Sequence, residues 1–233
     1  SLGTSGVVFA PTPRYTPDPR GRLHAFCYTD ADSWHVMGVI LAAAACQRWF
    51  RQLLGDDAQA PSFDALDDAI AASPPGAEGL LWLPYLSGER TPHNDPNARA
   101  VLAGASLAHG RAHVLRAIAE GVAFALADCF DLLADPCGVE VDELLVSGGG
   151  ARGDNQCQII ADVLGREIAR PAVDEGPAYG AALLAGEAAA LWTREAMAEQ
   201  LVIERRFEPR GELRALYDEA RGRFGELYRV LYG

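Results

Sequence analysis

The chain has 233 residues, with 32 Asp and Glu against 20 Lys and Arg, which gives a formal net charge of −12. This length allows a full hydrophobic core, as one large domain or two small ones. No apolar run approaches the roughly 20 residues of a membrane helix, and the first 30 residues lack the apolar stretch of a secretory signal. The acidic balance argues against a general nucleic-acid-binding protein, because such proteins carry a basic face. We therefore expect no nucleic-acid partner and no membrane partner.

The first half of the chain is predicted to contain strands separated by two helices. Residues 41–54 carry apolar side chains at helical spacing, and Gly55 ends that pattern. A proline-rich segment lies between the first two strands and is expected to be a loop. The predicted elements are strands at 7–9, 34–40 and 80–83, helices at 41–54 and 63–72, and the loop at 11–21.

The second half opens with an irregular segment at 84–96, where proline and polar residues argue against regular structure. A long amphipathic helix follows, with one apolar stripe along it. A helix rich in Ala and Gly is expected to pack close against a sheet. The predicted elements are helices at 112–133, 156–164, 178–191 and 213–232, and strands at 144–147 and 167–169. Because strands alternate with helices, we expect an α/β fold with one layered, mixed sheet flanked by helices.

Cysteine and histidine residues give no signal of a metal site. The five cysteines are scattered, form no C-x-x-C pair, and include two in apolar helical patterns, Cys46 and Cys129. We expect reduced, buried thiols in a cytoplasmic protein. His109 and His113 are four residues apart but lack a third ligand, so we expect them to face solvent or cap a helix.

Two glycine-containing turns are the candidate ligand-binding features. In the first, Gly3 permits a tight turn in which the hydroxyls of Thr4 and Ser5 and nearby amides can hold phosphate oxygens. In the second, three glycines lie between a strand and a helix, where the bare backbone can approach a phosphate or a base. These glycines are Gly148, Gly149 and Gly150. Each turn alone is better explained as an ordinary connection, and their combination favours a nucleotide site.

Five segments, in this order along the chain, form a recognisable set. They are SLGTSGV from Ser1, WLPYLSGERTPHN from Trp82, EGVAFAL from Glu120, SGGGAR from Ser147 and GPAYGAA from Gly176. Together these segments resemble the C-terminal half of the FGGY carbohydrate kinases. The LSGERTPH string is similar to the xylulokinase-like members of that family. The segments span most of the chain.

The resemblance implies an actin-like, ribonuclease H-type ATPase domain over residues 1–233, the nucleotide-binding domain of a two-domain kinase. It places Gly3, Thr4 and Ser5 at the β- and γ-phosphates of ATP. The residues that it places against the adenosine are Gly148, Gly149 and Gly150. Relatives often carry a glycine and, four residues later, a polar residue on the helix at 41–54, and Ala44 and Arg48 best match that pair.

The resemblance leaves one adenosine contact open. Many relatives have an asparagine shortly after the three glycines. This chain offers Gly153, Asp154 and Asn155 there, and the pattern does not choose among them. Elsewhere, charged residues are expected to be structural: Glu89 and Arg90 are expected to order the irregular segment through hydrogen bonds to the backbone. Two acidic pairs, Asp56–Asp57 and Asp67–Asp68, are expected to be solvated helix-end charges.

The same resemblance implies that the complete enzyme uses ATP and Mg²⁺ to phosphorylate a ketopentose such as D-xylulose. Its catalytic Asp and most of its sugar-binding residues belong to an N-terminal domain absent from this chain, so we expect no catalytic and no metal-binding residue here. The face that meets the absent domain is expected to be apolar and to permit a homodimer. Two alternatives stay open: a stand-alone nucleotide-binding or interaction module without kinase activity, and a kinase for another sugar or polyol.

Overall fold

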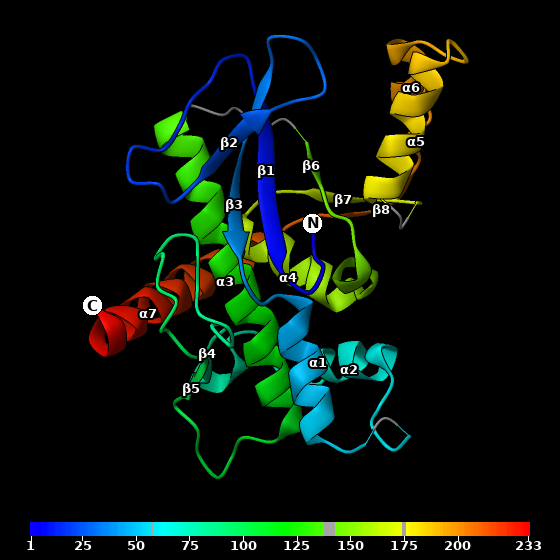
Figure 1. Ribbon diagram of the computed structural model, residues 1–233. Helices are drawn as coiled ribbons and strands as arrows, with labels where there is room; N and C mark the ends of the chain where they lie inside the picture. The colour runs from blue at the N-terminus through cyan, green and yellow to red at the C-terminus, as the bar shows by residue number, and fades with distance from the viewer. Residues whose placement is uncertain (57, 138–142, 174–175) are drawn as a thin grey trace.

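The computed structural model describes residues 1–56, 58–137, 143–173 and 176–233 (Figure 1). The long helix α3 (Arg111–Cys137) runs through the middle of the molecule, and most other elements pack around it. The helices around it are α1 (Ala44–Leu53), α2 (Phe63–Ala71), α4 (Asp154–Leu164) and α7 (Arg214–Tyr232). The helices predicted at 41–54, 63–72, 112–133, 156–164 and 213–232 are thus confirmed, with their ends shifted by a few residues.

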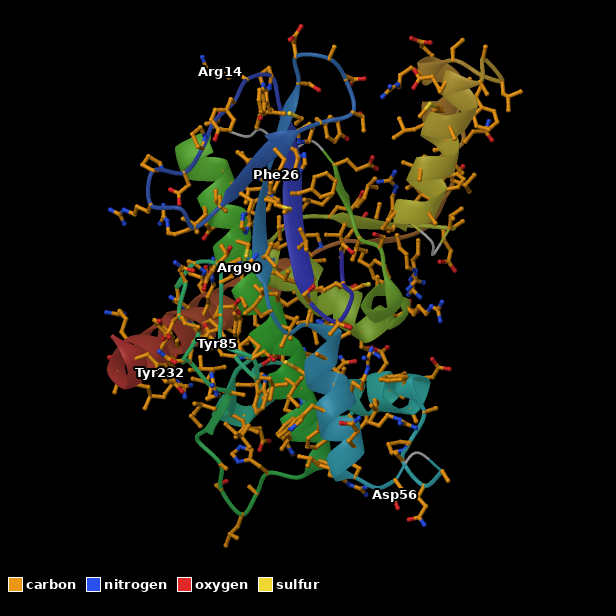
Figure 2. The ribbon with its side chains drawn as sticks, in the orientation of Figure 1. Arg14, Phe26, Asp56, Tyr85, Arg90 and Tyr232 are labelled. Carbon is orange, nitrogen blue, oxygen red and sulfur yellow. The ribbon has the colours of Figure 1, made fainter. Side chains whose placement is uncertain are left out.

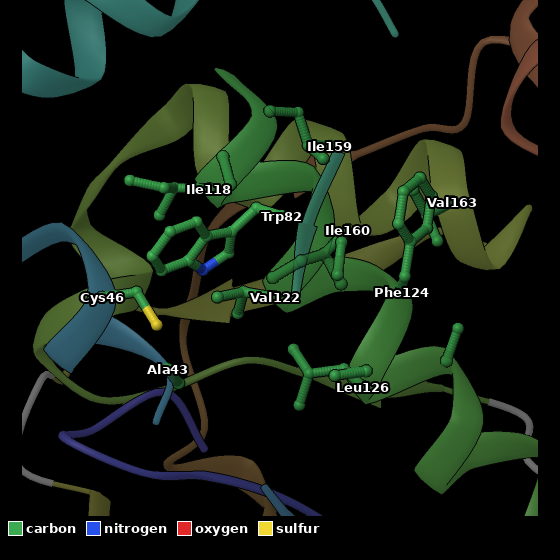
Figure 3. Close-up of a cluster of buried hydrophobic side chains, with 14 of the residues drawn as sticks. Ala43, Cys46, Trp82, Ile118, Val122, Phe124, Leu126, Ile159, Ile160 and Val163 are labelled. Carbon is green, nitrogen blue, oxygen red and sulfur yellow. The ribbon is translucent and has the colours of Figure 1, made fainter. Parts of the chain in front are cut away.

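Helix α3 is central because its apolar residues recur every three or four positions and are buried. The stripe consists of Leu115, Ile118, Val122, Leu126, Phe130 and Leu133, all less than 9% exposed. Figure 3 shows part of the resulting core, where Ile118 and Val122 pack near Trp82, Cys46 and Ile160. A buried stripe of this width anchors a helix through the hydrophobic effect, so α3 holds the elements on both of its sides in place.

Three antiparallel strands form the sheet beside α3, in the order β1 (Gly6–Thr12), β3 (Trp34–Ile40), β2 (His24–Cys27). The strands predicted at 7–9 and 34–40 are confirmed. The predicted loop at 11–21 begins two residues late, because Pro11 and Thr12 complete β1. Strand β2 was not predicted, since its sequence, HAFC, contains no β-branched residue and is largely exposed.

The remaining strands form two further small sheets. Strand β4 (Leu81–Leu83) pairs with β5 (Val101–Ala103), while β7 (Ile168–Pro171) lies between β6 (Leu144–Leu145) and β8 (Ile203–Phe207). The expectation of one layered sheet is therefore wrong. In the described ranges, β1 and β6 do not pair, and residues just outside these strands are linked by a hydrogen bond from the Leu2 amide to the Ser147 carbonyl at 2.7 Å. Such a bond does not make a continuous ladder.

Helices α5 (Gly176–Ala188) and α6 (Arg194–Glu199) stand to one side of the sheets (Figure 1). The helix predicted at 178–191 is confirmed, but its expected close packing on a sheet is not, because Gly186 is the one buried residue of α5. Its Gly186 instead packs against the ring of Trp192. A mostly apolar cavity of about 810 Å³ separates α5 from the sheets, and Leu126, Ile160 and Leu183 are among its lining residues.

The prediction of buried thiols holds for three of the four cysteines whose side chains the structure describes, and it is wrong for Cys27. Cys46, Cys129 and Cys157 are buried and Cys27 is exposed, and all four are free. The side chain of Cys137 lies outside the described residues, as does Asp57, which was expected to be a solvated helix-end charge. Among the residues that the structure describes, no helix is long and apolar enough to cross a membrane.

The irregular segment at 84–96 is held by the C-terminal helix α7. The rings of His93 and Tyr228 stack with their centroids 3.4 Å apart, and the Tyr85 hydroxyl lies 3.2 Å from His93 Nε2. Tyr228 also donates a hydrogen bond to Asp95 at 3.2 Å. Figure 2 shows Tyr85 and Tyr232 on this side of the molecule. Aromatic stacking and hydrogen bonding therefore join two segments far apart in sequence.

His93 makes the stability of this junction depend on pH. Burial lowers the pKa of His93 to about 4, although Asp95 acts in the opposite direction. The unfolded chain binds a proton at this histidine below about pH 6.5, whereas the folded chain does not until about pH 4. The free energy of unfolding is therefore expected to fall as the pH is lowered from 6.5 to 4. Urea titrations at several pH values measure it.

A His93→Gln variant is the control for this pH dependence. It removes the titrating imidazole, so its free energy of unfolding should change less between pH 6.5 and 4 than that of the wild type. Other groups titrate in the same range in both proteins, and only the difference between the two curves reports on His93. Parallel curves would show that His93 titrates normally in the folded protein.

Candidate nucleotide site

The N-terminal turn has the tight geometry that its sequence predicts. The Gly3 amide donates to the Ser5 carbonyl at 2.9 Å, and the Val7 amide donates to the Ser1 carbonyl at 2.9 Å. Thr4 is exposed at the tip of the turn, and Ser5 is half-buried. Both hydroxyls therefore belong to a short loop with a defined backbone, as a phosphate-binding turn requires.

The N-terminal turn provides hydrogen-bond acceptors for the first amides of helix α1. The residue before the helix, Ala43, has no side-chain group that could accept a hydrogen bond. Its amide donates to the Thr4 carbonyl at 2.9 Å, and the Ala44 and Ala45 amides donate to the Gly3 and Thr4 carbonyls at 3.1 and 3.3 Å. The first amides of a helix need such acceptors. The position of α1 and the conformation of the turn are consequently coupled.

The second glycine turn lies directly against the first. The Leu2 amide donates to the Ser147 carbonyl, and the Leu2 carbonyl accepts from the Gly150 amide at 2.8 Å. Residues Gly149–Arg152 form one turn of 3₁₀ helix before α4. The two turns that the sequence singled out, 145 residues apart, are thus joined by backbone hydrogen bonds through a single residue.

The three glycines of this turn differ in what surrounds them. A Cβ atom on Gly148, whose φ is +97°, would lie 2.8 Å from the Leu2 carbonyl oxygen. One on Gly150 would lie 3.0 Å from the same oxygen and 3.2 Å from the Cβ of Ala44. At Gly149 there is nothing within 4 Å, and this residue is exposed. Gly148 and Gly150 are therefore needed for packing, and Gly149 alone leaves open space beside the turn.

Helix α1 carries both of the residues that the sequence assigned to the nucleotide site, at different distances from the glycine turn. Ala44 packs next to Gly150, and Arg48 is exposed one helical turn further along. Between them, Gln47 was not predicted. Its Nε2 donates to Gln156 Oε1 at 2.9 Å, and this bond fastens α1 to α4. Its position between Ala44 and Arg48 was the only signal that could have found it.

Asp67 and Gly153 form a packing contact behind the turn. Asp67 of α2 accepts hydrogen bonds from the Asn155 amide at 3.0 Å and from the Gln156 amide at 3.2 Å. It thereby caps the N-terminus of α4, and the expectation that it is a solvated charge is wrong. A Cβ atom on Gly153 would lie 2.9 Å from Asp67 Cγ. Gly153 is thus required for this cap, and Asn155 is bound to Asp67 through its side chain as well.

Asp154 is held by arginines from the third sheet. It forms ion pairs with Arg170, at 2.9 Å, and with Arg205. Arg170 also donates to the carbonyls of Ala151 and Arg152, at 3.0 and 3.1 Å. The carboxylate therefore helps to fix the end of the glycine turn. The structure brings Gly3, Thr4, Ser5, Ala44 and the three glycines together, and it gives Gly153 and Asp154 supporting contacts.

The family of the chain follows from comparison with known proteins. The model of the C-terminal domain of the FGGY family of carbohydrate kinases matches residues 1–189. The chain belongs to this family. In the FGGY kinases the domain has an actin-like ATPase fold, as the sequence predicted.

Relatives of known sequence or structure agree with this membership. A xylulose kinase of Escherichia coli (strain K12) is 39% identical over 99% of this chain and 47% of its own length. A glycerol kinase of Citrifermentans bemidjiense is 37% identical over 78% of this chain and 36% of its own length. A crystal structure described as a xyloylose kinase from Brucella ovis has a TM-score of 0.88 and 38% identity, over all of this chain and 48% of its own. The chain thus spans about half the length of these FGGY relatives or less.

Within the described ranges, no three His, Cys, Asp or Glu side chains lie close enough to hold a metal ion. His109 and His113 accept hydrogen bonds through Nδ1 from the amides of Ser106, at 2.9 Å, and Gly110, at 3.0 Å. His113 thus caps the start of α3, which was one of the two roles expected, whereas His109 holds the turn before the helix.

Proposed function

We propose that this chain is the nucleotide-binding half of an ATP-dependent kinase whose complete form transfers the γ-phosphoryl group of ATP to the 5-hydroxyl of D-xylulose. The observation that carries the proposal is the junction of the Gly3–Thr4–Ser5 turn, the start of α1 and the glycine turn through Leu2. The xylulose kinase relatives support the choice of sugar. The glycerol kinase relative keeps another polyol as the second candidate, and substrate profiling of the complete protein distinguishes the two.

The residues present fit a bound nucleotide. Thr4 is exposed at a turn with a defined backbone, where its hydroxyl and neighbouring amides would hold the β- and γ-phosphates. The open space beside Gly149 would admit the adenosine next to Ala44 and Arg48 of α1. Mg²⁺, when bound, neutralises charge on the phosphates. The ion would be held mainly by the phosphates and by water.

The reaction also needs a base beside the sugar hydroxyl, and phosphoryl transfer depends on its alignment with the phosphates. We assign that base and most sugar contacts to the part of the kinase that corresponds to the other half of the relatives. The isolated chain is therefore proposed to bind ATP without phosphorylating D-xylulose. Sugar phosphorylation by the isolated chain would contradict this division of roles.

The second turn contains a glycine that faces open space and glycines that are tightly packed, and this difference allows a direct test of the nucleotide site. A Gly149→Val substitution places a side chain in open space, so the free energy of unfolding should stay within about 0.5 kcal/mol of the wild type while ATP binding weakens or is lost. Gly148→Ala forces a side chain against the Leu2 carbonyl oxygen and should lower stability instead. Calorimetric titration with ATP and urea unfolding measure the two effects.

Thr4→Ala is the companion variant in this test, because Thr4 is exposed and its loss should weaken ATP binding without unfolding the chain. If Gly149→Val and Thr4→Ala both bind ATP as tightly as the wild type, the nucleotide does not lie at these turns. If the wild type binds ATP in neither the isolated chain nor the complete protein, the proposed function fails.

A further inference from the structure

Glu89 is a buried acidic residue that the proposed reaction does not use. It lies in the irregular segment after β4 and is 2% exposed. Its backbone is fixed by two hydrogen bonds with Asp95, from amide to carbonyl in each direction, both at 2.8 Å. Figure 2 shows the adjacent Arg90 beside the sheet. The side chain of Glu89 is therefore presented to the interior from a backbone that has little freedom to move.

The carboxylate of Glu89 binds the end of strand β3. Its Oε1 accepts from the Arg90 amide at 2.7 Å and from the Leu41 amide at 3.1 Å, which confirms the predicted bonds to the backbone. Thr91 extends the same contact, because its amide donates to the Val39 carbonyl and its Oγ1 accepts from the Val39 amide, both at 3.0 Å. The segment 89–91 thus pairs with β3 where β2 no longer covers it.

The residue that Glu89 binds leads directly into the nucleotide site. Leu41 is followed by Ala42, which is buried, and then by the amides at 43–45 that donate to the carbonyls of Gly3 and Thr4. The backbone of this stretch has a second side-chain contact, because Cys46 Sγ donates to the Ala42 carbonyl at 3.6 Å. The Glu89 carboxylate and the phosphate turn are therefore connected by hydrogen bonds at the two ends of a short covalent backbone segment, residues 41–45.

We propose that Glu89 is a positioning residue for nucleotide phosphates, acting through Leu41 and the start of α1 on the Gly3–Thr4–Ser5 turn. This inference rests on the proposed nucleotide site. Glu89 binds the β3–α1 junction at the Leu41 amide, and the turn binds it at the amides of residues 43–45. A carboxylate is suited to this role because one oxygen can accept two amide hydrogen bonds, and charge-assisted bonds are stronger than neutral ones.

The surroundings of Glu89 explain why its charge should respond to pH near neutrality. Burial raises the pKa of Glu89 to about 7, against the two amide bonds that favour the charged form. Its Oε2 has no hydrogen-bond partner among the described residues, so a proton can bind there without displacing another group.

The titratable groups that face Glu89 come from several elements. They are Asp128 and Cys129 of α3, Cys46 of α1 and Tyr85 of its own segment. Asp128, which is paired with Arg221 at 2.5 Å, further raises the pKa of Glu89. Protonation would weaken the Leu41 bond by removing the charge on its acceptor.

The experiment compares the binding of ATP with that of adenosine, because only ATP has phosphates to meet the first turn. Binding is measured by calorimetry at pH 8 and pH 6, on the wild type, Glu89→Gln and Glu89→Ala. Amide NMR shifts of residues 3–5 are followed over the same pH range without nucleotide. Glu120→Gln is the matched control, since Glu120 is another buried carboxylate, 2% exposed, whose partners lie away from the turns.

We expect Glu89→Ala to weaken ATP binding about tenfold at pH 8, the factor for a lost hydrogen bond to a charged group, with adenosine binding unchanged. Glu89→Gln keeps an oxygen acceptor and should stay within about threefold of the wild type. The substitution should also remove the pH dependence of ATP binding that arises from Glu89. The dependence that remains should be the one due to ionisation of ATP itself. The amide shifts of residues 3–5 should titrate near pH 7 in the wild type and not in Glu89→Gln.

Equal losses for ATP and adenosine in the Glu89 variants, or equal effects in Glu120→Gln, would overturn the positioning role and leave the nucleotide site standing. Absence of ATP binding by the wild type, in the isolated chain and in the complete protein alike, would instead overturn the proposed function, while the amide shifts would still report whether Glu89 controls the turn. If Glu89→Ala does not fold, Glu89→Gln and the pH titration of the wild type decide the question.

Discussion

Replacing Glu120 by alanine is expected to lower the free energy of unfolding by about 3–5 kcal/mol, because it leaves a buried charge without its partner. Glu120 and Arg116 lie one turn apart on α3 and are 2% and 5% exposed. A single oxygen, Oε1, accepts from Arg116 Nε at 2.7 Å, from the Tyr217 hydroxyl at 3.1 Å and from the Gly76 amide at 2.8 Å. The carboxylate thus joins α3, α7 and the turn after α2.

The expected loss exceeds that of an ordinary hydrogen bond because Arg116 stays buried after the substitution. The Arg116 guanidinium still has the Tyr217 oxygen as an acceptor, at 2.7 Å, but no carboxylate to balance its charge. Urea unfolding at pH 7 measures the change. Glu219→Ala on the exposed face of α7 is the matched control and should alter the free energy by no more than about 0.5 kcal/mol. A loss below about 1 kcal/mol for Glu120→Ala would mean that water replaces the carboxylate.

Replacing Gly121 by alanine is the second change with a large expected effect. Helix α3 packs so closely on β4 at this point that a Cβ atom on Gly121 would overlap the carbonyl oxygen of Trp82. A backbone carbonyl cannot rotate away like the end of a side chain, so the helix and strand must separate. The expected loss in the free energy of unfolding is about 3 kcal/mol, at the upper end for overpacking.

The control for Gly121→Ala is the same substitution in another helix. Gly225 lies within α7, and nothing lies within 4 Å of a Cβ atom placed on it. Gly225→Ala should therefore raise the free energy of unfolding by about 0.5–1 kcal/mol, because alanine favours the helix. Opposite signs for the two substitutions are the expected result. A loss for both would show that a property of helical glycine other than packing is responsible.

The sequence alone predicted helices α1 to α5 and α7 and two strands of the first sheet, but not helix α6. Helix α3 was recognisable because its apolar residues follow the helical period over many turns, and every member of that stripe is buried. Short strands carry less information. Strand β8, with the sequence IERRF, has two arginines exposed on a sheet edge, and β5 has only three residues. Neither strand was predicted, because their pairing depends on partners far away in the chain.

The candidate site was likewise predictable from the sequence only in part. Glycine next to threonine and serine in a turn predicts an accessible backbone with neighbouring hydroxyls, because glycine lets a ligand come close to the backbone. Family resemblance then related Gly3, Thr4, Ser5 and the three glycines to a nucleotide. The contacts at Gly153 and Asp67 were not predictable, because the carboxylate that caps α4 comes from a helix 88 residues earlier. Cap residues are recognisable from sequence only when they adjoin the helix that they cap.

What the sequence by itself determined is therefore the family, the helices and the two turns, which depend on local residue types and their spacing. Only the tertiary structure decided that Leu2 joins the turns, that Gly148 and Gly150 serve packing while Gly149 faces open space, and that Glu89 holds the start of α1. Each of these depends on atoms brought together from distant parts of the chain. Hydrogen bonds and steric contacts act over a few ångströms of space, and sequence spacing does not report those distances.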